Sequence, residues 1–269
     1  VALLVPRAET LTMARVVVPA AVPGALATVA AGTDVAVDDV ALVAATGLAT
    51  VAVLLPTFGE AWVDGSSYGN ERRFPLRAPV LFTVLVAPLT WVLVVAGAVA
   101  GPLLLAARQW VPGVVALVLG WVVAAAGFRS LHQLSRRWLV LVPAGVVLHD
   151  QLAMPEPQLL FRRSIAALGP APRRGRGSGG PDDRIPARFD GDPGGEGFDD
   201  GPARDLTGGA AGLALQIELT EPVELLVRTG GRGAATERAS RLLFTPTRPA
   251  RVLEAARERR IPLASRGAG

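Results

Sequence analysis

Two long runs without a charged residue most constrain how this chain folds. No charged side chain occurs between Ala78 and Ala107, and none occurs between Gln109 and Phe128. A helix crosses the hydrocarbon core of a bilayer with about 20 consecutive apolar residues. Only a short polar break at Arg108 separates the two runs. The sequence therefore predicts two membrane-spanning helices, over 79–106 and 109–128, joined as a hairpin.

Two further apolar segments precede this hairpin. The first covers 14–33 and contains Pro19 and Pro23, and the second covers 38–57 and is rich in alanine. We expect both to be spans, which gives about four spans within residues 1–128. Two alternatives stay open: a soluble helical hairpin over both segments, or a signal peptide over 13–31 with a start at Met13.

The arginines indicate the orientation of these spans. All 27 basic residues are arginine, and most arginines of the N-terminal half precede the first span, lie between the second and third, or follow the fourth. Cytoplasmic loops carry such an excess of basic residues. We therefore expect a multi-pass protein of a bacterial plasma membrane with both termini in the cytoplasm. The use of arginine without lysine, with abundant Ala, Gly, Pro and Val, is typical of a GC-rich genome such as that of an actinobacterium.

The hydrophobic pattern changes after Arg137. Alternating apolar residues predict a hairpin from Trp138 to His149, closed by a turn at Pro143–Gly145. Further strands are predicted over 157–168, over 213–219 with a turn at Glu221–Pro222 and a return strand over 223–228, and over 241–245. A helix follows over 249–262, with an apolar stripe of Ala250, Leu253 and Ala256 and with Val252 alongside. Pro249 suits its first turn.

Several short strands and one closing helix predict a small β-barrel or sandwich. The segments WLVLVPAGVVLHD, LLFRRSIAAL, LALQIELTEPVELLV and LLFTPTRPARVLEAARER resemble bacterial pleckstrin-homology-like domains that are fused to membrane spans in actinobacteria. The resemblance implies a cytoplasmic pleckstrin-homology-like (PH-like) domain over 138–262. A Gly-, Pro-, Arg- and Asp-rich segment over 169–212 departs from the compact fold and is expected to be a flexible insertion. The predicted fold is thus a membrane helical bundle followed by this domain, with a basic juxtamembrane segment over 129–137 and a disordered tail over 263–269.

The arginines beside the predicted membrane surface are the candidate site. Anionic headgroups attract each such residue by ~1 kcal/mol near the surface. We expect lipid or partner contacts from Arg129, Arg136, Arg137, Arg162 and Arg163; the alternative is that these residues only set the topology. Gly97 and Gly101, four residues apart, are expected to let a neighbouring helix approach closely.

No pattern in the sequence indicates an enzyme. The chain has no cysteine and only two histidines, so thiolate chemistry is excluded and a metal site is not expected. We predict no catalytic residue, no cofactor and no nucleic-acid partner. The expected function is that of a non-enzymatic membrane protein, which tethers a binding module for a protein partner or for anionic lipid. The alternatives are an accessory subunit of a transporter or envelope-synthesis complex, and a membrane lipid enzyme with its site in the Asp64–Arg77 loop.

Overall fold

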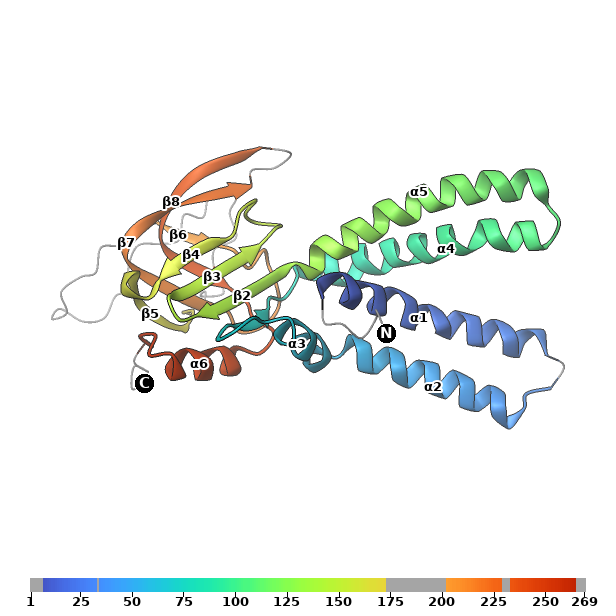
Figure 1. Ribbon diagram of the computed structural model, residues 1–269, viewed down its shortest axis with the longest axis horizontal. Coiled ribbons are helices and arrows are strands. Elements are labelled where there is room, and N and C mark those ends of the chain that lie inside the picture. Colours follow the sequence, from blue (N-terminus) through green and yellow to red (C-terminus); the bar gives the residue numbers. More distant parts are fainter. Residues whose placement is uncertain (1–6, 33, 173–201, 229–232, 265–269) are drawn as a thin grey trace. The chain divides into compact units, whose positions relative to one another are not determined.

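The computed structural model describes residues 7–32, 34–172, 202–228 and 233–264. The chain divides into two compact units, which are described separately (Figure 1). The helical unit comprises 1–69 and 73–137, and the sheet unit comprises 70–72 and 138–269.

The helical unit is built from long apolar helices. Its helices are α1 (Ala8–Ala31), α2 (Val37–Leu54), α3 (Pro56–Asp64), the π-helical turn η2 (Phe82–Val86), α4 (Ala87–Ala106) and α5 (Trp110–Ser135). Among the described residues, four helices are long and apolar enough to cross a membrane: α1, α2, α5 and the continuous helix Phe82–Ala106. Large apolar side chains point away from the helical unit, and Val37 and Val111 are 84% and 78% exposed. In water this apolar surface would be unfavourable, whereas in lipid it costs nothing.

The four predicted spans are confirmed as long apolar helices, but their ends differ from the predicted ones. Helix α1 begins at Ala8 instead of residue 14, and α5 continues to Ser135 instead of ending at residue 128. Most of the predicted juxtamembrane segment 129–137 is therefore the last part of α5.

Helices α4 and α5 pack through glycines. A Cβ atom built on Gly97 would lie 2.5 Å from the carbonyl oxygen of Gly120, and one built on Gly101 would lie 2.6 Å from the backbone nitrogen of Leu117. On α5, Gly127 lies against the side chain of Val94 in the same way. The partner that the sequence did not specify for Gly97 and Gly101 is thus α5. Close backbone approach replaces the hydrophobic effect, which does not drive helix association in lipid.

The sheet unit carries two four-stranded sheets and one helix, except that residues 73–75 of the first strand and Arg137 of the second belong to the helical unit. Its strands are β1 (Arg72–Pro75), β2 (Arg137–Val142), β3 (Gly145–Asp150), β4 (Gln158–Phe161), β5 (Ile165–Pro170), β6 (Ala203–Asp205), β7 (Leu215–Arg228) and β8 (Ala234–Phe244), with the short 3₁₀ helix η3 (Arg162–Ser164) and the closing helix α6 (Pro249–Glu258). The strand orders are β1-β2-β3-β4 and β5-β7-β8-β6. All pairings in the second sheet are antiparallel except that of β6 with β8.

The predicted turn at Glu221–Pro222 is wrong. Strand β7 continues through both residues, and its two halves pair with the same partner, from Leu215↔Phe244 to Arg228↔Ala234. The register shifts between Glu218 and Val223, so Pro222 lies at a bulge. A bulge tolerates proline because the ladder hydrogen bond is already missing there. The strand that returns beside β7 is β8, which begins at Ala234 and is longer than the predicted 241–245.

The single strand predicted over 157–168 is interrupted. Strand β4 ends at Phe161, η3 turns the chain, and β5 begins at Ile165 in the other sheet. This corner joins the two sheets and exposes Arg162 and Arg163.

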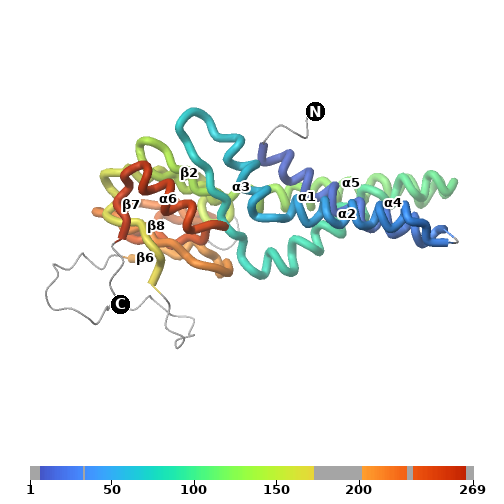
Figure 2. The backbone as a smooth tube through the Cα atoms, turned by 90° about the horizontal axis from the view of Figure 1, so that it is seen from below, coloured from blue at the N-terminus to red at the C-terminus, as the bar shows by residue number. Residues whose placement is uncertain are grey.

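Helix α6 packs on the core of the sheet unit (Figure 2). Pro249 occupies its first turn, as predicted. Its buried residues are Val252, Ala255 and Ala256, whereas Ala250 of the predicted stripe is exposed. The buried face of α6 is therefore a neighbouring face of the helix and not the predicted one. This alanine-rich helix has several apolar faces, and packing against the sheets decides which of them is buried. The core beneath contains fully buried Leu141, Leu148, Leu215, Ile217, Leu242 and Phe244.

Both ends of the predicted insertion 169–212 are ordered as sheet. Strand β5 runs to Pro170, and β6 covers Ala203–Asp205. The remainder, 173–201, and the end of the predicted tail, 265–269, lie outside the described residues.

Candidate functional site

The clearest cationic site lies at the corner between the two sheets. Phe161, the last residue of β4, is 46% exposed, and the guanidinium carbon of Arg163 lies 5.3 Å from the centre of its ring. An arginine over an aromatic face is a cation–π contact, which orders the guanidinium without removing its charge. The 3₁₀ turn positions both side chains, because it reverses the chain between two strands of different sheets.

The end of α6 adds further arginines to this corner. Nη1 of Arg162 donates to the carbonyl of Arg259, at a distance of 3.5 Å, and Arg259 donates in turn to the carbonyl of Asn70. Arg260 follows with a positive φ of 55° and ends the helix. Cations are stabilised at a helix C-terminus by its partial negative charge. We define the basic edge as Phe161, Arg162, Arg163, Arg259 and Arg260.

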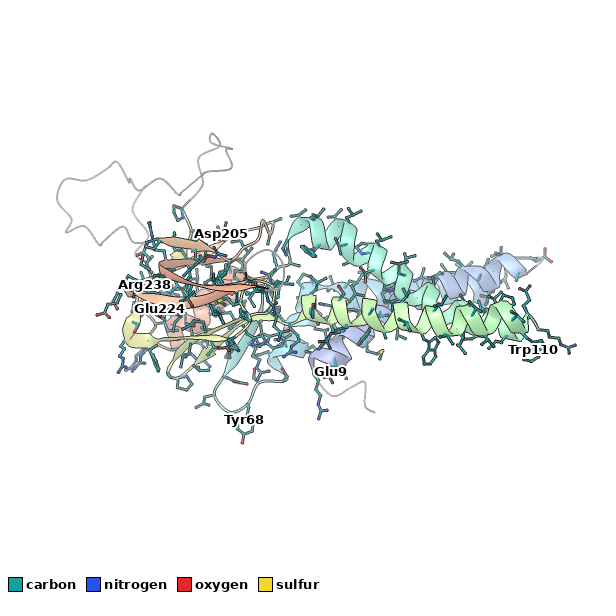
Figure 3. The ribbon with its side chains drawn as sticks, turned by 90° about the horizontal axis from the view of Figure 1, so that it is seen from above. Glu9, Tyr68, Trp110, Asp205, Glu224 and Arg238 are labelled. Carbon is teal, nitrogen blue, oxygen red and sulfur yellow. The ribbon has the colours of Figure 1, made fainter. Side chains whose placement is uncertain are left out.

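The charge of the basic edge is available for an anionic ligand. None of its four arginines forms an ion pair with a carboxylate in the part of the chain that the structure describes. Elsewhere in the sheet unit arginines are paired: Arg204 with Glu237 at 2.8 Å, and Arg238 with Glu224 at 3.1 Å. Figure 3 labels Arg238 and Glu224. The carboxylates next along α6 are Glu254 and Glu258, which are exposed. Guanidinium groups with free donors suit phosphate and carboxylate oxygens.

The five arginines predicted as the site divide between the two units. Arg162 and Arg163 belong to the basic edge, whereas Arg129 and Arg136 lie at the end of α5 in the helical unit. Arg129 is exposed. Arg137 is only 3% exposed, and its Nη1 donates to the carbonyl of Arg77 at 2.8 Å. The Arg137 guanidinium is thus engaged within the chain, and the predicted headgroup contact does not fit its burial.

Polar groups in the helical unit connect α1 with α5. The hydroxyl of Thr12, which is 3% exposed, lies 3.1 Å from Nδ1 of His132 and 2.7 Å from the hydroxyl of Ser135. The Ser135 hydroxyl donates to the His132 carbonyl at 2.8 Å. No carboxylate accepts from His132 among the described residues, so the arrangement lacks the third group of a nucleophile–base–acid triad. These hydrogen bonds connect the two apolar helices α1 and α5.

Two tryptophans form hydrogen bonds that connect α1 with α3 and α4. Nε1 of Trp62 on α3 donates to the Arg7 carbonyl and to the Thr10 hydroxyl, each at 3.1 Å. Nε1 of Trp91 on α4 donates to the Val16 carbonyl at 3.0 Å. Pro19 perturbs the backbone hydrogen bonding of α1 near this carbonyl because it has no N–H.

The Asp64–Arg77 loop, the alternative location for the site of a lipid enzyme, forms a turn. The Ser66 hydroxyl donates to the Val63 carbonyl, and the Asp64 carboxylate accepts from the backbone N–H of Arg73 at 3.2 Å. Both hydrogen bonds are local contacts that stabilise the conformation of the loop. No group of three or more His, Cys, Asp or Glu residues that could hold a metal ion is present in the described ranges. The second histidine, His149, stacks on Trp138 across β2 and β3 with ring centres 4.7 Å apart.

The basic edge is not recognisable in the sequence as a single site. In the sequence, Arg162 and Arg163 are predicted contacts, whereas Arg259 and Arg260 are predicted only as the end of a helix and Phe161 only as a strand residue. A signal is present in the sequence, because an aromatic residue directly before two arginines is unusual within a buried strand.

Comparisons with protein-family models, with curated proteins and with solved structures give no match.

Proposed function

We propose that this protein is a non-enzymatic integral membrane protein that holds a PH-like binding module at the inner face of a bacterial plasma membrane. The observation that carries the proposal is the basic edge, which has four arginines without a carboxylate partner among the described residues and an exposed phenylalanine that one of them, Arg163, covers. Four helices long enough to span a bilayer supply the anchor.

Anionic lipid headgroups are the ligand that this edge fits best. Headgroup phosphates accept hydrogen bonds from arginine, and an aromatic ring beside them partitions to the interface. Strand β2 starts at Arg137, directly after α5 ends at Ser135, so the connection to the last span is short. A short tether keeps the module at a high effective concentration near the bilayer. An acidic protein partner is the competing ligand.

The test uses the full chain with one cysteine, which the cysteine-free sequence makes straightforward. Glu258→Cys on α6 is labelled with an environment-sensitive fluorophore, and the protein is reconstituted in nanodiscs. We expect a blue shift with phosphatidylglycerol that is absent with phosphatidylcholine alone and weakens at high salt. The double change Arg163→Gln/Arg260→Gln should reduce the equilibrium constant for docking roughly 30-fold, since each arginine contributes ~1 kcal/mol.

Arg251→Gln is the matched control, because Arg251 is exposed on the same helix outside the basic edge. It should leave the blue shift unchanged. Equal shifts in both lipids would contradict headgroup binding. Crosslinking of position 258 to an acidic protein in native membranes, without any lipid effect in nanodiscs, would assign the basic edge to a protein partner instead.

A further inference from the structure

Arg15 is a partly buried cation in the helical unit. It lies on α1, about 10 Å along the helix axis from Ala8. Its guanidinium lies against Gly59 of α3, where a Cβ atom would come 2.5 Å from Nη2. The Nε atom is buried and has no hydrogen-bond partner among the described residues. Gly59, inside a nine-residue helix, thus provides the space that the guanidinium fills.

This guanidinium has no anionic partner in the described part of the chain. No carboxylate there forms an ion pair with Arg15. The hydroxyl of Thr12, one turn earlier on α1, is engaged with His132 and Ser135. A buried charge without a partner is costly, and one inside a membrane helix marks a functional site more often than a structural one. An arginine that only set the topology would bury at most its apolar stem and would keep its guanidinium in water.

The position of Arg15 along α1 lets its side chain reach the lipid phosphates. Helix α1 has 24 residues and is therefore about 36 Å long, which exceeds the roughly 30 Å hydrocarbon core by about 6 Å. The backbone of Arg15, about 10 Å from Ala8, therefore lies just inside the hydrocarbon boundary, from which a long arginine side chain reaches the headgroup level. Arg7 before α1 and exposed Arg129 on α5 add positive charge to the helical unit, and Glu9 is the acidic residue of the first turn.

We propose that Arg15 anchors a binding site in the helical unit for a phosphate-type oxyanion. The donors are the N–H groups of its guanidinium, held in place by Gly59, and the ligand comes either from a phospholipid headgroup or from free phosphate. This site is separate from the basic edge. It depends on α1 spanning a bilayer and does not depend on the PH-like module.

The experiment measures thermal unfolding of the full chain after delipidation in detergent. Phosphatidylglycerol should raise the Tm of the wild type by about 5 °C, because a ligand that binds only the folded state stabilises it. Diacylglycerol with the same acyl chains should give no rise. Part of this rise should persist in Arg163→Gln/Arg260→Gln, which lacks two arginines of the basic edge. Adding Arg15→Gln to that variant should abolish the remaining response, and adding Arg15→Lys should retain a smaller one because lysine lacks the planar fork. Inorganic phosphate separates the two sources: a rise with it assigns the site to the free anion, and its absence assigns it to the headgroup.

Arg108→Gln is the matched control. Arg108 is an exposed arginine of the same unit, and it lies in the short connection between α4 and α5. It should respond like the wild type. Arg15→Gln should fold, because removal of an unpaired cation does not cost folding stability. If Arg15→Gln fails to fold, Arg15→Lys still tests the site. An equal response of wild type and Arg15→Gln, or a response to diacylglycerol, would overturn the proposal. A response lost only in Arg163→Gln/Arg260→Gln would also overturn it and would support the basic edge instead.

Discussion

Gly145 shows how one residue positions the basic edge. It is buried at the start of β3, and a Cβ atom there would collide with the Leu160 carbonyl and come 2.8 Å from the backbone nitrogen of Arg162. That nitrogen donates to the carbonyl of Ala144 at 2.8 Å. The turn between β2 and β3 therefore contacts the backbone from which Arg162 and Arg163 project, and only a residue without a side chain permits this contact.

Gly145→Ala should destabilise the sheet unit by ~2–3 kcal/mol, because backbone must move to accommodate the methyl group. Chemical denaturation in detergent measures the loss, followed by the fluorescence of Trp138 in a background where the other four tryptophans are replaced by phenylalanine. Ala144→Ser, at the exposed neighbouring position, should unfold at the wild-type denaturant concentration. Equal midpoints for Gly145→Ala and the wild type would show that the contact carries no strain.

At the scale of elements, the pairing of α4 with α5 depends on small residues spaced along both helices. Gly97 faces Gly120, Gly101 faces Leu117, and Gly113 faces Leu105. Helices in lipid associate through such close packing because apolar burial between them brings no gain. By contrast, a Cβ atom added to Gly24 on α1 or to Gly47 on α2 would meet no atom within 4 Å, so those glycines lie where space is open.

Gly120→Leu should separate α4 from α5 and lower the Tm of the helical unit by several degrees, since the new side chain meets backbone. Gly47→Leu adds the same group at an open position and should leave the Tm unchanged or raise it, because leucine favours helix over glycine. The comparison is made in one detergent at one lipid content. A larger loss for Gly47→Leu than for Gly120→Leu would contradict the packing.

At the scale of the whole molecule, the proposed orientation follows from where charged residues interrupt the helices. The connections α1–α2 and α4–α5 carry Asp34 and Arg108, and the segment between α2 and α4 carries Arg72, Arg73 and Arg77. If all four helices span the membrane, as we propose, the first two connections lie on one side and the third lies with both termini on the other.

Single cysteines at Asp34 and Arg251 should therefore react on opposite sides. An impermeant maleimide added to intact cells should label Asp34→Cys and should label Arg251→Cys only after the membrane is permeabilised. Arg108→Cys serves as a second external position and should behave like Asp34→Cys. Labelling of Arg251→Cys on intact cells at the rate of Asp34→Cys would refute the orientation.

The PH-like identity of the sheet unit stays a prediction, since the comparisons give no match. The structure shows two sheets and a closing helix, a coarser description than the resemblance implies.

Local sequence determined the features that depend on local physics. Length and hydropathy alone decide whether a segment can cross a bilayer, so the four apolar helices were predictable from the sequence. The β2–β3 hairpin and the proline at the start of α6 follow from turn and cap chemistry within a few residues. Gly97 and Gly101 were identifiable as a packing surface, although their partner was not.

Tertiary structure decided whatever depends on contacts between distant residues. Pro222 lies inside a strand because β8 pairs on both sides of it, and Val252 is buried because the sheets select that face of α6. The arginines show the same limit: Arg137 is buried on a carbonyl, Arg163 covers a ring, and Arg15 lies against a glycine 44 residues away. Their side chains are chemically identical, so only the neighbours that folding brings to each could separate their roles.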